Sequence, residues 1–214
     1  MSARASLTGL ILSGGQGRRM QQASPGGQVE KGLLVVDGLP LVEHARRLLA
    51  PHTANILISA NTHLEAYAQY GIVVPDDSRL GAYSGPLAGV ASALACSTTP
   101  WMVVMPVDVM ALPGDLVPRL LEAVSEDGSL RDGPRKDGPR IAYARTRDFV
   151  HPLCMVLHRT LRQSLHDFLL SGERKVQLWQ RRNEAAAVLF EDAGHAFFNI
   201  NTPQDLLQAR SLRD

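Results

Sequence analysis

The sequence predicts an α/β fold in which a mostly parallel central sheet is covered by helices on both faces. Three observations support it: short apolar runs alternate with amphipathic stretches up to residue 125, glycines and prolines punctuate them, and 214 residues suit one domain. Parallel strands need a crossover between them, so strands that alternate with helices are typical of a parallel sheet. We therefore expect one domain spanning residues 1–214.

Four apolar runs in this first part have the length of strands. They occupy residues 7–12, 55–60, 72–74 and 101–106. Helices are predicted between and after them, beginning at Pro40, spanning 63–70, beginning at Pro86, and covering 116–124. The helix from Pro86 has an apolar residue at each of the i, i+3, i+4 and i+7 positions that form one buried face.

The pattern changes at residue 125. Residues 125–140 read SEDGSLRDGPRKDGPR and contain almost no apolar side chain, so they are predicted to form an exposed, mobile loop. Two strands are predicted after it, at 141–146 and 153–157, joined by a turn near Asp148.

Two more helices complete the prediction. The first has apolar residues at helical spacing from Leu161 and closes at Gly172. The second begins in the string NTPQD, where Thr202 can cap the helix, Pro203 suits its first position, and Asp205 stands three residues after the cap.

Composition argues against several classes of protein. The chain has 22 basic and 21 acidic residues, a formal net charge of +1, and 5% aromatic residues, which is atypical of a nucleic-acid-binding surface. The first apolar stretch is interrupted by Gly9 and too short to span a bilayer. We expect no nucleic-acid or membrane partner and a cytoplasmic location. Cys96 and Cys154 lack metal-ligand spacing, which predicts two buried, reduced thiols.

The stretch GLILSGGQGRRM predicts a turn that binds an anion. Gly14 and Gly15 follow the first strand directly, so the chain can turn tightly there and expose its amide N–H groups. Arg19 and Lys31 supply positive charge that suits a polyphosphate. The dinucleotide fingerprint would need glycine in place of Met20, and the Walker A pattern is also missing from the sequence. A tight turn beside solvated charges remains the alternative.

A second candidate lies in the stretch WMVVMPVDVMALP. Asp108 follows the buried strand 101–106 and so falls at the edge of the sheet where open parallel sheets bind ligands. Mg²⁺ prefers one or two carboxylates together with phosphate oxygens and waters, which makes Asp108 a candidate Mg²⁺ ligand. The alternative is that Asp108 only forms a turn or caps a helix.

Seven strings, several of them uncommon, occur in order along nearly the whole chain: LSGGQGRRM, EKGLL, SGPLAG, PVD, HPLCMVLHR, GERKV and FFNINTPQDL. In this order they resemble the bacterial molybdenum cofactor guanylyltransferases. The resemblance implies a single Rossmann-like nucleotidyltransferase domain, similar to that of many glycosyltransferases with the GT-A fold. It also implies that GMP is transferred from Mg²⁺-bound GTP to the terminal phosphate of molybdenum-carrying molybdopterin, with release of pyrophosphate.

The resemblance further implies roles for particular residues. The catalytic residues would be Lys31, Arg19 and Asp108, with Asp108 as the metal ligand. The residues that bind GTP would be Leu12, Ser13, Gly14, Gly15, Arg19, Lys31, Asn61, Asp77, Gly85, Gly89 and Asp108. Asn199 and Asn201 would lie on the molybdopterin side, so that the N-terminal half binds GTP and the C-terminal half binds molybdopterin. The second glycine of the pair at 14–15 indicates guanine, because relatives that use CTP tend to have alanine there.

The chain departs from the family's pattern near this site. Ser59 stands where the family usually has an asparagine, and Thr62 where an arginine is common. Glu30 replaces the customary aspartate before Lys31, and the stretch between Met20 and Lys31 is longer than usual. The resemblance therefore implies no role for Ser59 or Thr62.

Other functions stay open on sequence alone. A molybdopterin cytidylyltransferase or a sugar-phosphate nucleotidyltransferase would share the glycine turn, Lys31 and Asp108. An inactive module that binds a molybdopterin nucleotide would release no pyrophosphate. We expect Mg²⁺ as the cofactor, GTP and molybdenum-carrying molybdopterin as substrates, a monomer, and transient contacts with proteins that supply the cofactor or, as apo-molybdoenzymes, receive it.

Overall fold

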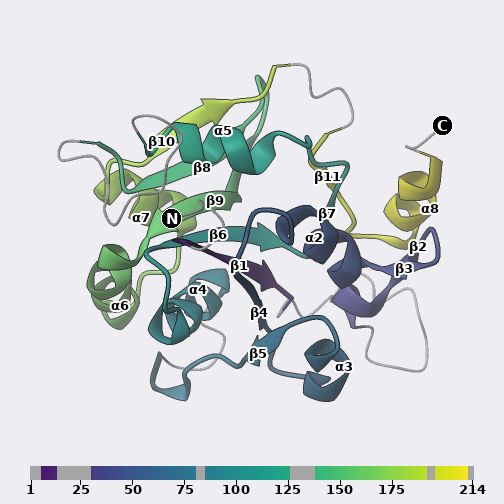
Figure 1. Ribbon diagram of the computed structural model, residues 1–214, viewed down its shortest axis with the longest axis horizontal. Coiled ribbons are helices and arrows are strands. Elements are labelled where there is room, and N and C mark those ends of the chain that lie inside the picture. The colour runs from purple at the N-terminus through teal and green to yellow at the C-terminus, as the bar shows by residue number, and fades with distance from the viewer. Residues whose placement is uncertain (1–5, 14–29, 81–84, 126–137, 192–195, 212–214) are drawn as a thin grey trace.

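The computed structural model describes residues 6–13, 30–80, 85–125, 138–191 and 196–211. Within these residues the main sheet has seven strands in the order β10-β8-β9-β6-β1-β4-β5 (Figure 1). Its pairings are parallel except those of β9, which runs antiparallel to both β6 and β8. The predicted, mostly parallel α/β sheet is confirmed, with one reversed strand.

The elements alternate along the chain as a parallel sheet requires. The strands of the main sheet are β1 (Leu7–Leu12), β4 (Asn55–Ser59), β5 (Ile72–Val74), β6 (Trp101–Pro106), β8 (Ile141–Arg145), β9 (Val150–His158) and β10 (Ala186–Leu189). Two short antiparallel pairs are β2 (Val35–Val36) with β3 (Leu39–Pro40), and β7 (Val109–Met110) with β11 (Phe198–Asn199). The helices are α2 (Leu41–Leu49), α3 (Leu64–Ala68), α4 (Pro86–Cys96), α5 (Leu116–Glu122), α6 (Arg162–Leu170), α7 (Val176–Arg182) and α8 (Pro203–Ser211), with 3-10 turns at Lys31–Leu33, Ser78–Leu80 and Arg159–Leu161.

Each face of the sheet carries its own apolar layer, because successive residues of a strand point to opposite faces. In β6, Trp101, Val103 and Met105 pack with α2 and α5 on one face. Met102 and Val104 pack with α4, α6 and α7 on the other. The prediction of helices on both faces is therefore confirmed.

The first part of the chain agrees closely with the prediction. The four predicted strands are β1, β4, β5 and β6, and the predicted helices are α2, α3, α4 and α5. In the second part β9 begins at Val150, earlier than predicted, after a turn closed by hydrogen bonds between Thr146 and Phe149. Residues 126–137, most of the predicted mobile loop, lie outside the described residues.

The two cysteines differ in environment. Cys154 in β9 is buried, and burial, followed by the charge of Asp108, raises the pKa of its thiol well above the usual range. Cys96 is exposed, so the prediction that it is buried is wrong. It ends α4 two positions after the buried Leu94, about 200° around the helix from it, and so lies off the apolar face.

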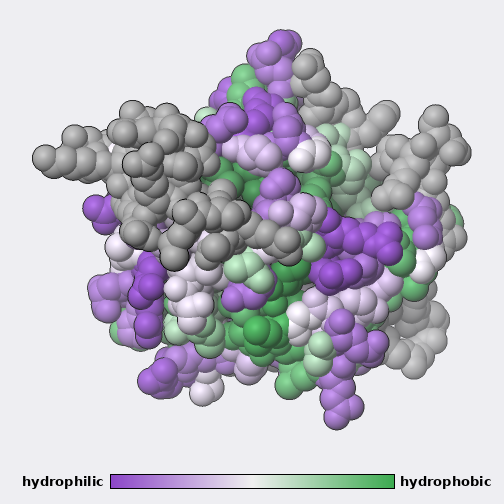
Figure 2. Space-filling model, in the orientation of Figure 1, coloured by the Kyte–Doolittle hydropathy of each residue, from purple (hydrophilic) through white to green (hydrophobic). Residues whose placement is uncertain are grey.

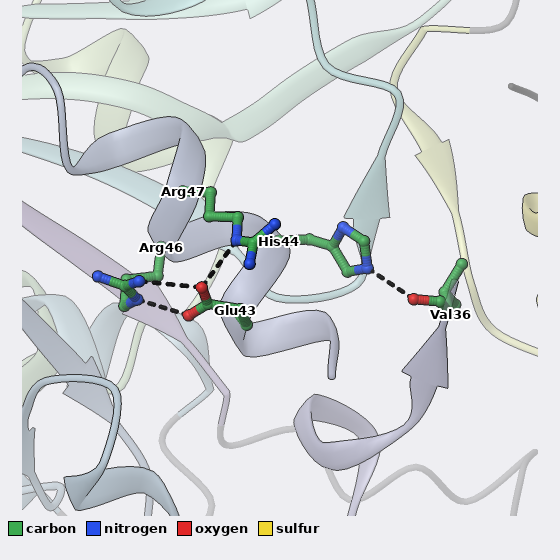
Figure 3. A network of polar contacts seen from close by, with 5 residues as sticks. All are labelled: Val36, Glu43, His44, Arg46 and Arg47. Carbon is green, nitrogen blue, oxygen red and sulfur yellow. Dashed lines mark hydrogen bonds and ion pairs between the residues drawn. The ribbon is translucent and has the colours of Figure 1, made fainter. Parts of the chain in front are cut away.

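Polar contacts lie within α2 and between α2 and β2. Glu43 accepts hydrogen bonds from Arg46 (2.5 Å) and Arg47 (2.8 Å), and the contact with Arg46 is the main cause that lowers the pKa of Glu43 to about 2. His44 Nε2 donates to the carbonyl of Val36 in β2, at 2.9 Å (Figure 3). The helix is thereby tied to the β2–β3 pair.

The surface has mixed polarity. On the face drawn in Figure 2, hydrophobic surface lies between hydrophilic patches. Ile72, in the edge strand β5, is a large hydrophobic residue that is 59% exposed. Among the helices that the structure describes, none is both long and apolar enough to cross a membrane.

His158 is a buried histidine that the fold keeps neutral. Its side chain packs edge-on against Trp101, with the ring centroids 4.7 Å apart, and Nδ1 accepts a hydrogen bond from the amide of Thr160. Burial, and then the positive charges of Arg140 and Arg159, lower its pKa from 6.5 to about 4. Protonation therefore favours the unfolded chain.

We predict that the free energy of unfolding falls as the pH is lowered from 6.5 towards 4, because the unfolded state takes up this proton first. Below pH 4, His158 should have lowered the free energy of unfolding by an amount on the order of 3 kcal/mol. His158→Asn keeps an acceptor for the Thr160 amide and cannot be protonated in this range. Urea unfolding across this pH range should show a flatter dependence for the variant; equal slopes for the two proteins would contradict the assignment.

Candidate active site

The carboxyl ends of the parallel strands lie at one edge of the sheet, on the side of β7, β11 and α8 (Figure 1). The end of β1 is tied to both of its neighbours. The amide of Ser13 donates to the carbonyl of Ser59 (2.9 Å), and the amide of Val107 donates to the carbonyl of Leu12 (3.0 Å). Open α/β sheets bind ligands at this edge, and the buried Leu12 and Ser13 lie there.

Lys31 is buried at this edge between two acceptors. Its side chain is only 9% exposed, and Nζ donates to Asp108 Oδ2 at 2.6 Å and to Asn201 Oδ1 at 2.8 Å. Removing an ammonium group from water is unfavourable unless such acceptors replace its hydration. The structure thus brings together three predicted site residues from separate parts of the chain.

Asn201 is held in place by the start of α8. Asp205 Oδ2 accepts hydrogen bonds from the amides of Asn201 and Thr202, both at 2.8 Å, and the amide of Asp205 donates to the Thr202 hydroxyl. Burial alone would raise the pKa of Asp205, but these hydrogen bonds and the charge of Lys31 outweigh it and lower the pKa. The predicted helix cap therefore forms. It also orients Asn201, and the sequence did not indicate this second role.

The predicted nucleoside contacts lie after β4 and β5. Asn61 Nδ2 donates to the carboxylate of Asp76 (3.0 Å), and its Oδ1 accepts from the Asp76 amide (2.9 Å). Asp77 forms an ion pair with Arg79 (2.7 Å), and hydrogen bonds from Arg79 lower the pKa of Asp77 to about 2. Asn61 and Asp77 thus flank the carboxyl ends of two adjacent parallel strands.

The structure gives a different geometric reason for glycine at each of two predicted site positions, 85 and 89. Gly85 precedes α4 with φ 72°, a left-handed backbone conformation that glycine adopts without steric cost. A Cβ at Gly89, within α4, would collide with the Ser59 side chain at the end of β4. The close approach at Gly89 is therefore between helix and strand. The remaining predicted residues, Gly14, Gly15 and Arg19, lie outside the described residues.

A pocket of about 540 Å³ opens at the same edge of the sheet, beyond β8 and β10. It is lined by residues 146–151, by Phe190 and Glu191, and by residues 196–199. The volume and the mixture of aromatic and charged walls suit a small molecule. Asn199 lines this pocket, whereas Asn201, two residues later, contacts Lys31, so the pocket and the Lys31 cluster are neighbours.

An aromatic stack forms one wall of the pocket. The rings of His151 and Phe197 are parallel, with centroids 4.1 Å apart, and Phe197 has a left-handed φ of 60° that is unusual for a bulky residue. Burial lowers the pKa of His151, and its buried Nε2 has no hydrogen-bond partner among the described residues. The aromatic residues of this wall are far apart in the sequence. Only the His-Pro pair at 151–152 and the string FFN at 197–199, both within the strings that carry the family resemblance, pointed to it.

The donor set at Asp108 limits which metal site is possible. No group of three or more His, Cys, Asp or Glu side chains that could hold a metal occurs within the described ranges. The Asp108 side chain is 26% exposed. Its second oxygen, Oδ1, accepts no hydrogen bond from any residue that the structure describes. One available carboxylate oxygen fits Mg²⁺ only when substrate phosphates and waters complete its shell.

Comparison with known proteins extends this description. Residues 9–187 match the model of the MobA-like NTP transferase domain. The chain is 38% identical over 206 residues to a molybdenum cofactor guanylyltransferase of Cupriavidus pinatubonensis, covering 96% of this chain and 97% of the relative. It is 37% identical over 213 residues to one of Ralstonia nicotianae, covering 100% of both chains. The crystal structure of molybdopterin-guanine dinucleotide biosynthesis protein A from Archaeoglobus fulgidus superposes with a TM-score of 0.66 at 23% identity, covering 96% of this chain and 98% of that one.

A parallel sheet whose carboxyl edge pairs a buried lysine with an aspartate is suited to phosphate chemistry, and the matched domain and relatives define the class as a nucleotidyltransferase. The particular family follows from the same findings. The chain belongs to the MobA-like NTP transferases, among the molybdenum cofactor guanylyltransferases.

We predict unequal effects on stability when the two partners of the ion pair are removed separately. Lys31→Met leaves Asp108 partly exposed and able to hydrate, so the free energy of unfolding should change by less than about 1 kcal/mol. Asp108→Ala leaves a buried ammonium with Asn201 alone and should cost about 1.5–3 kcal/mol. Urea unfolding at pH 7 measures both, and equal losses would contradict the view that Lys31 is the desolvated partner.

Proposed function

We propose that this protein transfers GMP from GTP to the terminal phosphate of molybdenum-carrying molybdopterin, forming the guanine dinucleotide cofactor and releasing pyrophosphate. The observation that carries the proposal is the contact of the buried Lys31 with Asp108 and Asn201, next to two regions that we propose to bind the substrates. One region is the glycine-rich end of β1 with the residues after β4 and β5, and the other is the pocket beside Asn199. A transferase that joins two substrates needs such an arrangement.

The nucleotide side is proposed to hold GTP in the N-terminal half. Leu12 and Ser13 would contact it through the backbone, together with Gly14, Gly15 and Arg19, while Asn61 and Asp77 would lie at the nucleoside. Gly85 and Gly89 would shape the start of α4 at the same edge. Lys31 would place its positive charge against the phosphates, where it stabilises the negative charge that develops on the departing pyrophosphate.

Asp108 is proposed to hold Mg²⁺ through Oδ1, which accepts no hydrogen bond from the described residues, with triphosphate oxygens and waters completing the shell. When bound, Mg²⁺ supplies charge neutralisation and polarises the α-phosphate. Lys31 keeps the Asp108 side chain oriented, and Asn201 shares the ammonium so that it remains directed towards this edge. The single carboxylate is consistent with a metal that arrives with its nucleotide.

The acceptor needs little help from the protein. A phosphate monoester is already anionic at neutral pH, so no general base is required, and the chain's task is to align it and to compensate charge. We propose that the pocket beside Asn199 binds molybdopterin in the C-terminal half. Its stacked His151 and Phe197 and the exposed ring of Phe149 suit a planar heteroaromatic system such as a pterin.

The proposal extends to the setting of the reaction. We propose that the enzyme works as a monomer in the cytoplasm, and that transient contacts with other proteins bring molybdopterin to it and pass the product to apo-molybdoenzymes. The support is the family's role in building a cofactor that other enzymes use. Single-domain organisation over residues 1–214 belongs to the same proposal.

The function is tested by incubating the protein with molybdenum-carrying molybdopterin, Mg²⁺ and either GTP or CTP, then measuring the dinucleotide product and pyrophosphate. We expect the guanine product, and none after chelation of Mg²⁺. Asp108→Ala should lower kcat/KM at least about a hundredfold, because one such electrostatic stabiliser contributes about 3 kcal/mol. Asp115→Ala, which removes an exposed carboxylate at the start of α5, is the matched control.

Three results would contradict the proposal. Preferential use of CTP would indicate a cytidylyltransferase, and transfer only to a sugar phosphate would indicate a different acceptor class. Nucleotide binding without pyrophosphate release would indicate an inactive binding module. Near-normal turnover of Asp108→Ala with Mg²⁺ would remove this residue from the mechanism.

The acceptor pocket gives a separate prediction. Phe149 is 69% exposed, so Phe149→Ala should fold normally. Loss of one aromatic contact should raise the KM for molybdopterin roughly three- to tenfold and leave the KM for GTP unchanged. Leu170→Ala removes an apolar side chain of similar exposure from α6 and should change neither value. If Phe149→Ala changed the KM for GTP alone, the pocket would bind GTP instead of molybdopterin.

A further inference from the structure

A buried tyrosine lies behind the site and joins two segments that are far apart in sequence. Tyr67 in α3 is 0% exposed, and its hydroxyl contacts Ser13 Oγ and, at 2.5 Å, Glu30 Oε1. Ser13 and Glu30 flank residues 14–29, the segment that contains the glycine-rich turn. One phenolic oxygen therefore connects both ends of that segment.

The direction of these hydrogen bonds follows from chemistry. A phenol has one hydrogen to donate, and a carboxylate can only accept, so Tyr67 donates to Glu30 and Ser13 donates to Tyr67. Burial, followed by the hydrogen bond to Glu30, raises the pKa of Tyr67 far above its usual value of 10.0. The hydroxyl therefore keeps its proton at neutral pH and the order of donors is fixed.

Glu30 is held at its other oxygen as well. Its side chain is 11% exposed, and Oε2 accepts a hydrogen bond from the Thr62 hydroxyl at 3.0 Å and lies 3.3 Å from His63 Nδ1. Glu30 and Thr62 are two of the positions at which the chain departs from its family's pattern, and here they are partners. The carboxylate thus has a defined place and orientation.

The backbone after Lys31 packs on the same group. A Cβ at Gly32 would collide with both Ser13 Oγ and the hydroxyl of Tyr67. Lys31 therefore lies between two residues that Tyr67 constrains, Glu30 through a hydrogen bond and Gly32 through close packing. Any shift of the Tyr67 hydroxyl partners would move the start of the Lys31 side chain.

We propose that Tyr67 is a positioning residue of the active site, which fixes Glu30 and Gly32 and so sets where the Lys31 ammonium meets Asp108. The role is exerted through Lys31, since Tyr67 is fully buried and touches no substrate. The proposal rests on the proposed function only in that GMP transfer serves as its kinetic readout.

The test is a double-mutant cycle with Tyr67→Phe and Lys31→Met. Tyr67→Phe keeps the buried ring and removes only the hydroxyl, so it should fold while kcat falls about tenfold to a hundredfold, as expected for losing a hydrogen bond to a charged group. In the Lys31→Met background the same change should alter kcat less than about twofold. A purely structural role would give the same loss in both backgrounds and overturn the proposal.

Two further variants sharpen the reading. Tyr70→Phe removes a hydroxyl three residues further along, outside this network, and should leave kcat unchanged. Glu30→Gln keeps an oxygen that accepts from Tyr67 and should retain more activity than Glu30→Ala; equal losses would overturn the hydrogen-bond argument.

A crystal structure of Tyr67→Phe gives a readout that does not depend on turnover. Loss of the contact between Lys31 Nζ and Asp108 would support the positioning role, and its retention would overturn it. Absence of GMP transfer in the wild-type protein would sink the proposed function, and the crystallographic comparison would still decide the role of Tyr67.

Discussion

The candidate active site depends on one interaction above others, the burial of the Lys31 ammonium between Asp108 and Asn201. An ammonium removed from water must find acceptors, and here they come from positions 77 and 170 residues further along the chain. The turn after β6 and the start of α8 are thereby drawn to the end of β1. A charge pair of this kind adds little net stability, so its position is better explained by what it offers to a phosphate group.

The direction of the strands explains how one edge can serve two substrates. β1, β4, β5 and β6 run in parallel and have their carboxyl ends at the side proposed for the nucleotide. β9 is reversed, which lets β8 and β10 run parallel to β6 and end at the same edge, where the pocket lined by Asn199 opens. The short pairing of β7 with β11 then connects the two regions through Asn199 and Asn201.

The sequence predicted the first half of the fold well because its strands are continuous apolar runs and its helices repeat apolar residues at helical spacing. It did not indicate β10, whose sequence AAVL has weak strand character and pairs only with β8, or α7, which is a short helix. Lys31 and Asp108 could be named from their types and their places after strands. Their contact, and the burial of Lys31, depend on tertiary packing that no local pattern records.

The same limit applies to the residues that support the site. Asp205 could be placed three residues after the predicted cap, Thr202, but its hydrogen bond to the amide of Asn201 could not be foreseen. Nothing in the sequence singled out Tyr67 within its short helix, because its hydroxyl partners lie 54 and 37 residues away in the chain. The assignment of Asn199 and Asn201 to one side could not distinguish the pocket-lining side chain from the one that contacts Lys31.

The long separation between Lys31 and Asn201 also bears on how the enzyme comes into being during translation. Chains emerge from the ribosome N-terminal end first, so the strands and helices of the first part of the chain can form while the second acceptor of the ammonium has yet to be synthesised. Until residue 201 emerges, the lysine cannot donate to the side chain of Asn201. A nascent polypeptide can therefore acquire most of this sheet before it acquires a complete catalytic cluster.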